Sequence, residues 1–295
     1  MAEPAAPTPA GPDLRRTVAV LGVAVLVAAI CVAAGLWQWN RHADRSAAVE
    51  IVRSNYEATP LPVAEVLTQG EPLPGDAVWQ PVTLEGTYDD ESTVLLRNRP
   101  VGGQPGYHVL TPVEIASGPL AGEVLVVDRG WVPTAAEGTG PALEPAAPAG
   151  VVEITARLRA DEAPATRDAP AGQVHAISVD QVREAGGGRW TADATLGAYG
   201  SLMTENGDPP MDLGALARPS TDLGSHLSYA FQWWVFALGA LGGGVVLLRR
   251  ERATEMEDDG VRPAGEPPAG RPARRRRRPT VDDEEEDALL DAQQV

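Results

Sequence analysis

One histidine stands beside a long apolar segment in a setting that suits a bound macrocycle. His226 immediately precedes an uncharged run of residues. On a helix, at about 100° per residue, the aromatic residues that share its face are Tyr229, Trp233 and Phe236, with Gln232 at the edge. A neutral imidazole can bind the iron of a porphyrin, and aromatic side chains can cover the ring. The same residues are also typical of the aromatic belt at a membrane surface, which spacing alone favours.

The residues needed for several other chemistries are missing. Cys31 is the only cysteine, which excludes an intrachain disulfide, a CxxC redox pair and a cysteine-pair copper site. The histidines are scattered, so a classical zinc centre is not supported. Two of them, His108 and His175, lie in or near predicted strands and are expected at the surface or in turns. A membrane-anchored hydrolase has weak support, since there is no GxSxG elbow. We therefore predict that the protein is not an enzyme.

Two uncharged runs are long enough to cross the hydrocarbon core of a membrane, which takes about 20 apolar residues. They comprise residues 17–39 and 227–248. A cleaved signal peptide is the alternative for the first run, but the apolar core of such a peptide has only about 7 to 15 residues. We predict two transmembrane helices with these bounds.

Positive charge beside the second run predicts the orientation. Arg249, Arg250 and Arg252 follow the run, whereas Arg218 alone lies shortly before it. Arginine and lysine are enriched on cytoplasmic flanks, so the C-terminus is expected inside, and two spans place the N-terminus on the same side. The sequence thus predicts a multi-pass protein of the cell membrane with both termini cytoplasmic and residues 40–226 outside.

The two ends of the chain are predicted to be disordered cytoplasmic segments, residues 1–16 and 249–295. The second combines an arginine run at 274–278 with an acidic run at 282–287, and neither segment can build a core. The arginines could meet anionic membrane lipid, but the acidic run competes for them, and a solvated tail is favoured. A net charge of −17, with every basic residue an arginine, argues against nucleic acid as a partner.

Alternation of apolar and polar residues between the two runs predicts β-strands. Ser178 with Gln181 resembles a helix-capping box, and the glycines at 186–188 should end the short helix that it begins. Together these patterns predict an α+β, strand-rich extracytoplasmic domain, built as a small sheet or barrel. The predicted strands are residues 82–88, 94–97, 107–112, 123–128 and 152–159.

Small residues recur at four-residue spacing in both apolar runs, which allows helices to approach closely. We expect the two spans to pack on each other through these residues, with a subunit of a partner membrane complex as the alternative. The small residues are Ala24, Ala28, Ala29 and Ala33 in the first run and Gly239, Ala240, Gly243 and Gly244 in the second.

Short motifs occur along residues 35 to 240 in an order that is specific to one family. They are GLWQWNR at 35–41, GTY at 86–88, LLRNR at 95–99, GYHVLTP at 106–112, VDRGWVP at 127–133 and HLSYAFQW at 226–233. In these motifs and in its topology the sequence resembles the Surfeit locus protein family, membrane factors for the biogenesis of cytochrome c oxidase. Residues 186–217 and the C-terminal tail carry no such motif, and nothing functional is transferred to them.

The resemblance implies an assembly factor for cytochrome c oxidase that binds heme a and aids its insertion into the catalytic subunit. The resemblance favours heme contact at His226 over the interpretation as an aromatic belt. It implies that the histidine is the iron ligand and that Tyr229 and Trp233 lie beside the porphyrin ring. The implied partners are the catalytic subunit, the enzyme that makes heme a and membrane lipid. The alternative is a membrane-anchored scaffold that contacts the oxidase without binding heme.

Arg129 and Trp131 form the strongest motif of the predicted domain. The Arg129 guanidinium could pair with a heme propionate or with a carboxylate of a partner. It could equally be a structural partner of Asp128 or another acid, with Trp131 in the core.

Gln38 and Arg41 complete the expected cofactor-binding residues. They lie at the outer end of the first span, and could meet His226 because both spans end on that side. The alternative is that they are ordinary interfacial anchors.

Overall fold

The computed structural model describes residues 14–136, 138 and 140–259. Of the two segments predicted to be disordered, 1–16 and 249–295, residues 1–13 and 260–295 lie outside the described residues, and the arginine and acidic runs lie there too. Residues 14–16 and 249–259 are helical, so the prediction was wrong for them, because the apolar helices continue past the charged residues that flank them. By its internal contacts the chain divides into a main unit, Leu26–Gly239, and a smaller unit made by its two ends, up to Val25 and from Ala240.

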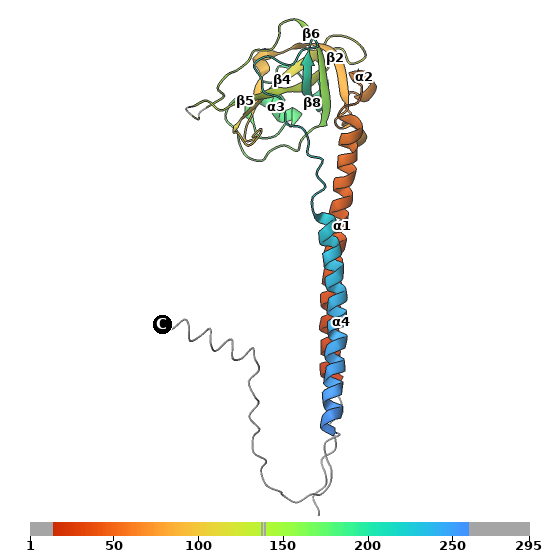
Figure 1. Cartoon of the computed structure of the whole chain (residues 1–295). Helices are drawn as coiled ribbons and strands as arrows, with labels where there is room; N and C mark the ends of the chain where they lie inside the picture. The colour runs from red at the N-terminus through yellow and green to blue at the C-terminus, as the bar shows by residue number, and fades with distance from the viewer. Residues whose placement is uncertain (1–13, 137, 139, 260–295) are drawn as a thin grey trace, which may run out of the picture. The chain divides into compact units, whose positions relative to one another are not determined.

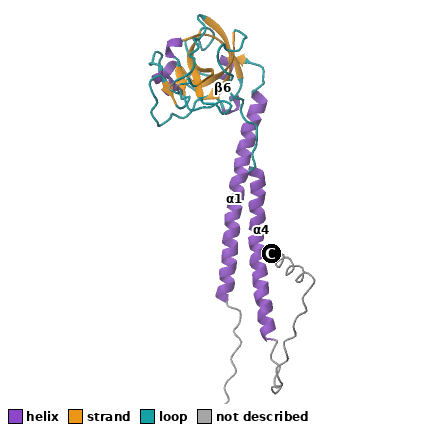
Figure 2. Ribbon diagram, turned by 60° about the vertical axis from the view of Figure 1, so that its left-hand side comes forward, coloured by secondary structure: helices purple, strands orange, loops and turns teal. Residues whose placement is uncertain are grey.

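Two long helices contain the apolar runs. Helix α1 covers Leu14–Asn55 and helix α4 covers His226–Asp259. Both have the length and the apolar composition needed to cross a membrane. Figures 1 and 2 show them running side by side. Helix α1 continues well beyond Trp39 because residues 40–55 contain neither glycine nor proline, and Val49 and Val52 maintain a buried stripe in this extension.

Within the smaller unit, the helices approach closely at small residues. A Cβ added at Gly244 would lie 2.9 Å from the Cβ of Ala24, so a larger residue cannot stand there without displacing the other helix. Only one of the two predicted small-residue registers faces this contact, because Gly239 and Gly243 have open space beside them. Ala29 and Ala33 are exposed, so their predicted place between the helices is wrong.

The domain between the helices is one mixed sheet of eight strands, as the predicted alternation indicated. The strands pair in the order β1-β2-β6-β8-β5-β4-β3-β7, and β2 also pairs with β4, which closes β2, β6, β8, β5 and β4 into a ring. The closed pairing leaves no free edge on these five strands. The strands are β1 Leu61–Pro62, β2 Pro81–Tyr88, β3 Val94–Leu96, β4 Gly106–Ile115, β5 Val124–Pro133, β6 Val151–Ala160, β7 Gln173–Val174 and β8 Thr195–Glu205.

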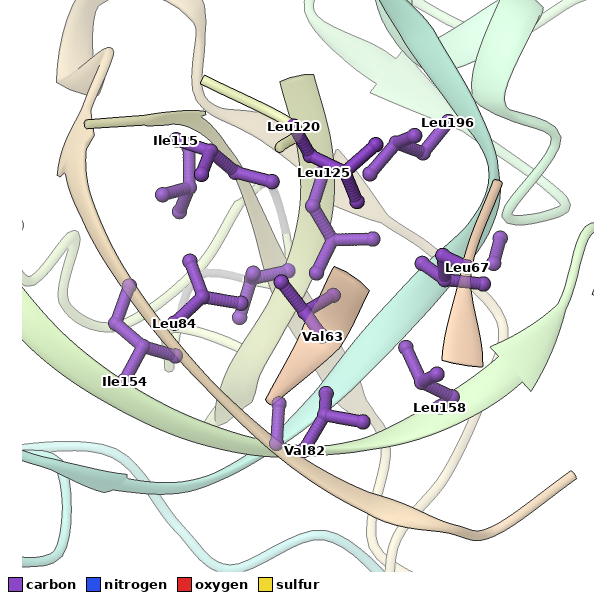
Figure 3. Packing of buried hydrophobic residues seen from close by; sticks show 14 of the residues in the cluster. Val63, Leu67, Val82, Leu84, Ile115, Leu120, Leu125, Ile154, Leu158 and Leu196 are labelled. Carbon is purple, nitrogen blue, oxygen red and sulfur yellow. The ribbon is translucent and has the colours of Figure 1, made fainter. Parts of the chain in front are cut away.

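Alternate side chains of these strands fill the interior of the ring. On β6 the residues predicted to face a core are buried, from Val152 to Leu158 at every second position. Figure 3 shows this core, where the labelled side chains of β2, β4, β5 and β6 converge with those of the segment that contains α2, Val63–Val66. Burial of this many branched aliphatic side chains is the main force that holds the ring closed.

A second core lies on the outer face of the same strands. On β5, Leu125 and Val127 belong to the interior core whereas Val126 belongs to the outer one, as expected where successive side chains point to opposite faces. Helix α3, Val179–Ala185, packs here with Val179 and Val182. Because of this outer layer, polar residues on the outer face of β4 and β5 are buried as well.

Helix α3 begins after Ser178 and ends at Gly186, as predicted. The predicted capping box does not form, because the Ser178 side chain makes no capping hydrogen bond. Gln181 instead bonds in both directions with the backbone of Ala165, at 2.9 Å each. Three short 3₁₀ turns complete the domain, at Gly75–Ala77, Asp90–Ser92 and Ala192–Ala194.

Candidate functional site

The structure brings Gln38 of α1 together with His226, the first residue of α4. The Gln38 Oε1 atom lies 2.9 Å from the His226 Nδ1 atom. Both side chains are partly buried, and the contact joins residues 188 positions apart in the chain. The prediction that the outer end of the first apolar run meets His226 is therefore confirmed for Gln38. Arg41 is exposed and makes no hydrogen bond or ion pair with the described residues.

A set of contacts along α1 fixes where His226 stands. The segment before α4 runs along the extension of α1, where the Arg45 guanidinium donates to the carbonyls of Asp222 at 2.9 Å and Ser220 at 2.7 Å. Further along, Arg218 pairs with Glu57 at 2.7 Å.

The spacing of these contacts is consistent with an extended segment lying against a helix. Glu57 lies just beyond α1, and from the end of the helix at residue 55 to residue 38 is 55 − 38 = 17 residues, or about 26 Å of helix. From residue 218 to residue 226 is 226 − 218 = 8 residues, or about 26 Å of extended chain. The linker therefore has little slack, and His226 is held at the height of Gln38.

Gly224 leaves the other edge of the His226 ring open. Its φ of +68° is one that side-chain-bearing residues rarely adopt, and its N–H donates to the Asp222 carboxylate at 2.9 Å. A Cβ at this position would lie 3.5 Å from the His226 Cδ2 atom and 3.7 Å from Nε2. Among the described residues, Nε2 has no hydrogen-bond partner. One ring nitrogen is therefore held and the other is free.

Aromatic side chains continue this surface along α4. Tyr229 is 48% exposed and Phe236 is 49% exposed. Trp233, which is half-buried, meets the Phe236 ring edge-on at 6.0 Å between centroids. The resulting face is apolar and reachable from outside the protein, as the helical spacing predicted.

A second aromatic group closes the seam between the helices. Trp234 lies 6.0 Å from Trp39 and 5.5 Å from Phe231, measured between ring centroids. Its ring covers Gly35, where an added Cβ would collide with the indole. This group fixes the two helices against each other beside the His226–Gln38 contact.

Arg129 is buried inside the domain and is only 2% exposed. Its Nε donates to Glu205 at 3.0 Å, and its terminal nitrogens reach the carbonyls of Pro145 at 3.1 Å and Ala146 at 3.4 Å. The guanidinium also lies over the Tyr88 ring, 5.1 Å from its centroid. This is the internal ion pair of the second interpretation, with Glu205 in place of Asp128.

The same pair perturbs a neighbouring phenol. Burial and the Glu205 carboxylate raise the pKa of Tyr88, and Arg129 opposes them. Tyr88 therefore stays neutral over the whole range in which the protein would work.

Trp131 is half-buried, and its contacts are within the sheet domain and not with the ends of the long helices. Its backbone exchanges two hydrogen bonds with Gly214, at 3.0 Å and 2.7 Å. Its ring covers Gly106 on one side and Gly214 on the other, since a Cβ at either glycine would be in close contact with the Trp131 indole.

The prediction for His108 is wrong. This histidine is 5% exposed, not at the surface or in a turn, and its Nδ1 lies 2.8 Å from the Oδ2 of Asp128, itself 4% exposed. The cause is the outer layer of β3, β7 and α3, which covers this face of the sheet. The sequence did contain a signal for this pair, because His108 and Asp128 belong to two of the family motifs and these motifs lie on adjacent strands. His175 follows β7, is half-buried, and contacts Asn98 at 3.2 Å, in keeping with its prediction.

A further ion pair was not predicted. Arg99 donates to both oxygens of Glu162, at 3.0 Å and 2.8 Å, and Glu162 also accepts the backbone N–H of Ile177 at 3.0 Å. Burial acts to raise the pKa of Glu162, but these donors outweigh it and the pKa is lowered. Burial raises the pKa of the neighbouring Tyr199 to about 12. No local pattern could reveal a pair whose members are 63 residues apart.

The domain also contains a cleft of about 510 Å³, between β3, β4 and the loop that follows β5. Asp90, Thr93, Glu144 and Gln173 contribute its polar lining. None of the predicted cofactor-binding residues lines it, so this cleft is separate from the surface at His226.

Comparison with known proteins shows which protein family the chain belongs to. A family model described as the SURF1 family matches residues 25–238. An uncharacterized SURF1-like protein of Mycobacterium bovis is 33% identical over 243 residues, which cover 80% of this chain and 83% of the relative. SURF1-like proteins from two strains of Mycobacterium tuberculosis match with the same identity and coverage. The family is generally one of cytochrome oxidase assembly factors and is not a known class of enzyme. The chain belongs to the SURF1 family, as its motifs indicated.

Proposed function

We propose that the protein is a cell-membrane assembly factor for cytochrome c oxidase that binds heme a and passes it to the catalytic subunit. Helices α1 and α4 are the two spans, the sheet domain lies outside, and both termini are cytoplasmic. The arginines after Leu248 support this orientation. The family supports the role in assembly.

The observation that carries heme binding is the state of the His226 ring. Gln38 holds Nδ1, and Nε2 is without a partner among the described residues, beside the aromatic face of Tyr229 and Trp233. When bound, heme supplies an iron whose axial position a neutral imidazole can fill. Gly224 keeps this edge of the ring clear, and the aromatic residues of α4 offer apolar surface on which a bound ring can lie.

The exposure of this surface fits transient binding. Tyr229 is about half-exposed, so a partner can approach the ligand from the same side. We assign the exposed Arg41 to a heme propionate, because a guanidinium pairs well with a carboxylate. Arg129 and Trp131 are left out of the heme site, because their contacts hold the domain together. The enzyme that makes heme a is a second partner, and membrane lipid surrounds the spans.

The test uses cells that make heme a and lack this protein. They are supplied with the wild type, with His226→Ala, or with His175→Ala as a matched control. The measurements are the heme a content of the catalytic subunit and the amount of that subunit that co-purifies with the protein.

We expect His226→Ala to keep the catalytic subunit bound while lowering its heme a content, and His175→Ala to behave as the wild type. Full heme a content with His226→Ala would favour the alternative, a scaffold that contacts the oxidase without binding heme.

A further inference from the structure

We infer that Gln38 is a positioning residue, which holds His226 in the tautomer that carries its proton on Nδ1 and presents Nε2. The purpose assigned to this tautomer, presentation of Nε2 to the iron of heme, rests on the proposed function. Gln38 itself then makes no contact with the cofactor, in contrast to its expected role as one of the cofactor-binding residues.

The atoms in contact determine the tautomer. The Gln38 atom at 2.9 Å from Nδ1 is the amide oxygen, which can only accept a hydrogen bond. Nδ1 must therefore carry the proton. A neutral imidazole has a single N–H, so Nε2 keeps its lone pair. Metal-binding histidines commonly have their second nitrogen held in this way, which fixes the ring and makes the ligand more basic.

The structure also determines which side of the ring is available. Nε2 has no hydrogen-bond partner among the described residues, and Gly224, where a Cβ would lie 3.7 Å from Nε2, carries no side chain. The linker contacts with Arg45 prevent His226 from sliding along α1 away from Gln38. Gln38 is thus fixed on a rigid helix, and the His226 ring is held at the same height along that helix. A residue that orients a ligand has to be held in this way.

Substitutions at Gln38 distinguish two roles of its side chain: accepting the hydrogen bond from Nδ1 of His226, and filling space beside the ring. Gln38→Leu has a similar size but cannot accept the Nδ1 proton. Gln38→Glu keeps an acceptor oxygen at the same place. Gln104→Leu is a matched control, because it removes an exposed glutamine of the sheet domain whose side chain makes no hydrogen bond with the described residues.

The first experiment needs no heme. The full-length protein, labelled with ¹⁵N-histidine and purified in detergent, is studied by NMR, and the His226 signals are identified by their loss in His226→Ala. We expect the Nδ1–H tautomer in the wild type, in Gln38→Glu and in Gln104→Leu, and a shift toward Nε2–H in Gln38→Leu. An Nε2–H tautomer in the wild type, or an unchanged tautomer in Gln38→Leu, would overturn the inference.

The second experiment titrates the same proteins with heme a. Loss of a partner that orients a metal ligand typically weakens binding by roughly 10- to 100-fold, so we expect that loss in Gln38→Leu and recovery in Gln38→Glu. If the wild type has the Nδ1–H tautomer but binds no heme a, the proposed function fails while the tautomer assignment stands. If the wild type and Gln38→Leu bind heme a equally well, the positioning role fails while the proposed function stands.

Discussion

The buried cation of the sheet domain and the histidine of the helix ends differ in how fully their polar atoms are engaged. Arg129 is almost completely buried, and each of its nitrogens has a partner inside the domain. His226 has one nitrogen held, whereas the other has no partner in the described part of the chain, on a surface where Tyr229 is half-exposed. A group with every bond made inside the fold can hold that fold together. Only a group with a free bonding position can take up a ligand and release it.

The energetics of burial explain the difference. A charge removed from water is tolerated only when a partner and hydrogen bonds replace its hydration, so Arg129 is confined to Glu205 and the loop carbonyls. His226 can be neutral, and a neutral imidazole with one unpaired nitrogen has a much smaller cost at a partly exposed site.

Removal of the buried cation should unfold the domain without any direct effect on the helix ends. Arg129→Ala leaves Glu205 buried without its partner, and the expected loss is about 3–5 kcal/mol of unfolding free energy, measured by denaturation in detergent. The double variant Arg129→Met/Glu205→Leu should recover most of it, because an apolar pair needs no compensating charge. Arg189→Ala, in an exposed ion pair, should have no measurable effect. A wild-type midpoint for Arg129→Ala would contradict the structural role of the pair.

A side chain at Gly35 should loosen the helix seam beside His226. The added Cβ of Gly35→Ala would collide with Trp234, and overpacking of this kind typically costs about 1–3 kcal/mol. Gly239→Ala is the control, since nothing lies within 4 Å of its added Cβ. We expect a lower melting temperature and a weaker Gln38–His226 contact for Gly35→Ala alone. Equal melting temperatures for the two variants would show that the seam is not tightly packed.

A methyl group at Gly224 should affect the free side of the His226 ring. The φ of +68° makes Gly224→Ala strained by about 1 kcal/mol, and its Cβ would touch the ring edge that carries Nε2. Gly207→Ala has similar backbone strain, at φ +85°, with nothing within 4 Å. Heme a content should therefore fall in Gly224→Ala and stay normal in Gly207→Ala. The same heme content in both would mean that the Nε2 edge is not where iron binds.

The Arg99–Glu162 pair predicts a pH dependence of domain stability. The pKa of Glu162 in the folded protein is below its usual value of 4.5, so its stabilising contribution is present above pH 4.5 and is lost as the pH falls through the lower, folded value. The unfolding midpoint of the wild type should drop in this acid range, and less so in Glu162→Gln. Burial raises the pKa of Asp161, which acts in the opposite sense, so Asp161→Asn should make the acid loss steeper. Identical acid profiles for all three would refute the assignment.

Strand positions and one contact of the site could be predicted from the sequence, because their causes are local or topological. Alternation on β6 directly reflects a ring with a filled interior. The meeting of Gln38 with His226 follows from two helices that end on one side, whatever the domain between them does. The helical extension to Asn55 was not predicted, because the first charged residues end an apolar run without ending a helix.

Contacts between distant strands could not be predicted. Arg129 meets Glu205 across 76 residues, and no periodicity links their positions. His108 was misplaced because alternation indicates a face of the sheet but not whether another layer covers that face. Its partner Asp128 was considered only as a partner for Arg129, which points to the opposite face of β5.

The most direct test of the central claim measures heme and stability on the same samples. Wild-type protein and His226→Ala are purified in detergent from cells that make heme a, and the heme a to protein ratio and the melting temperature of the domain are determined for both. We expect His226→Ala to lose heme a while its domain melts as in the wild type. A wild-type heme ratio in His226→Ala would contradict it.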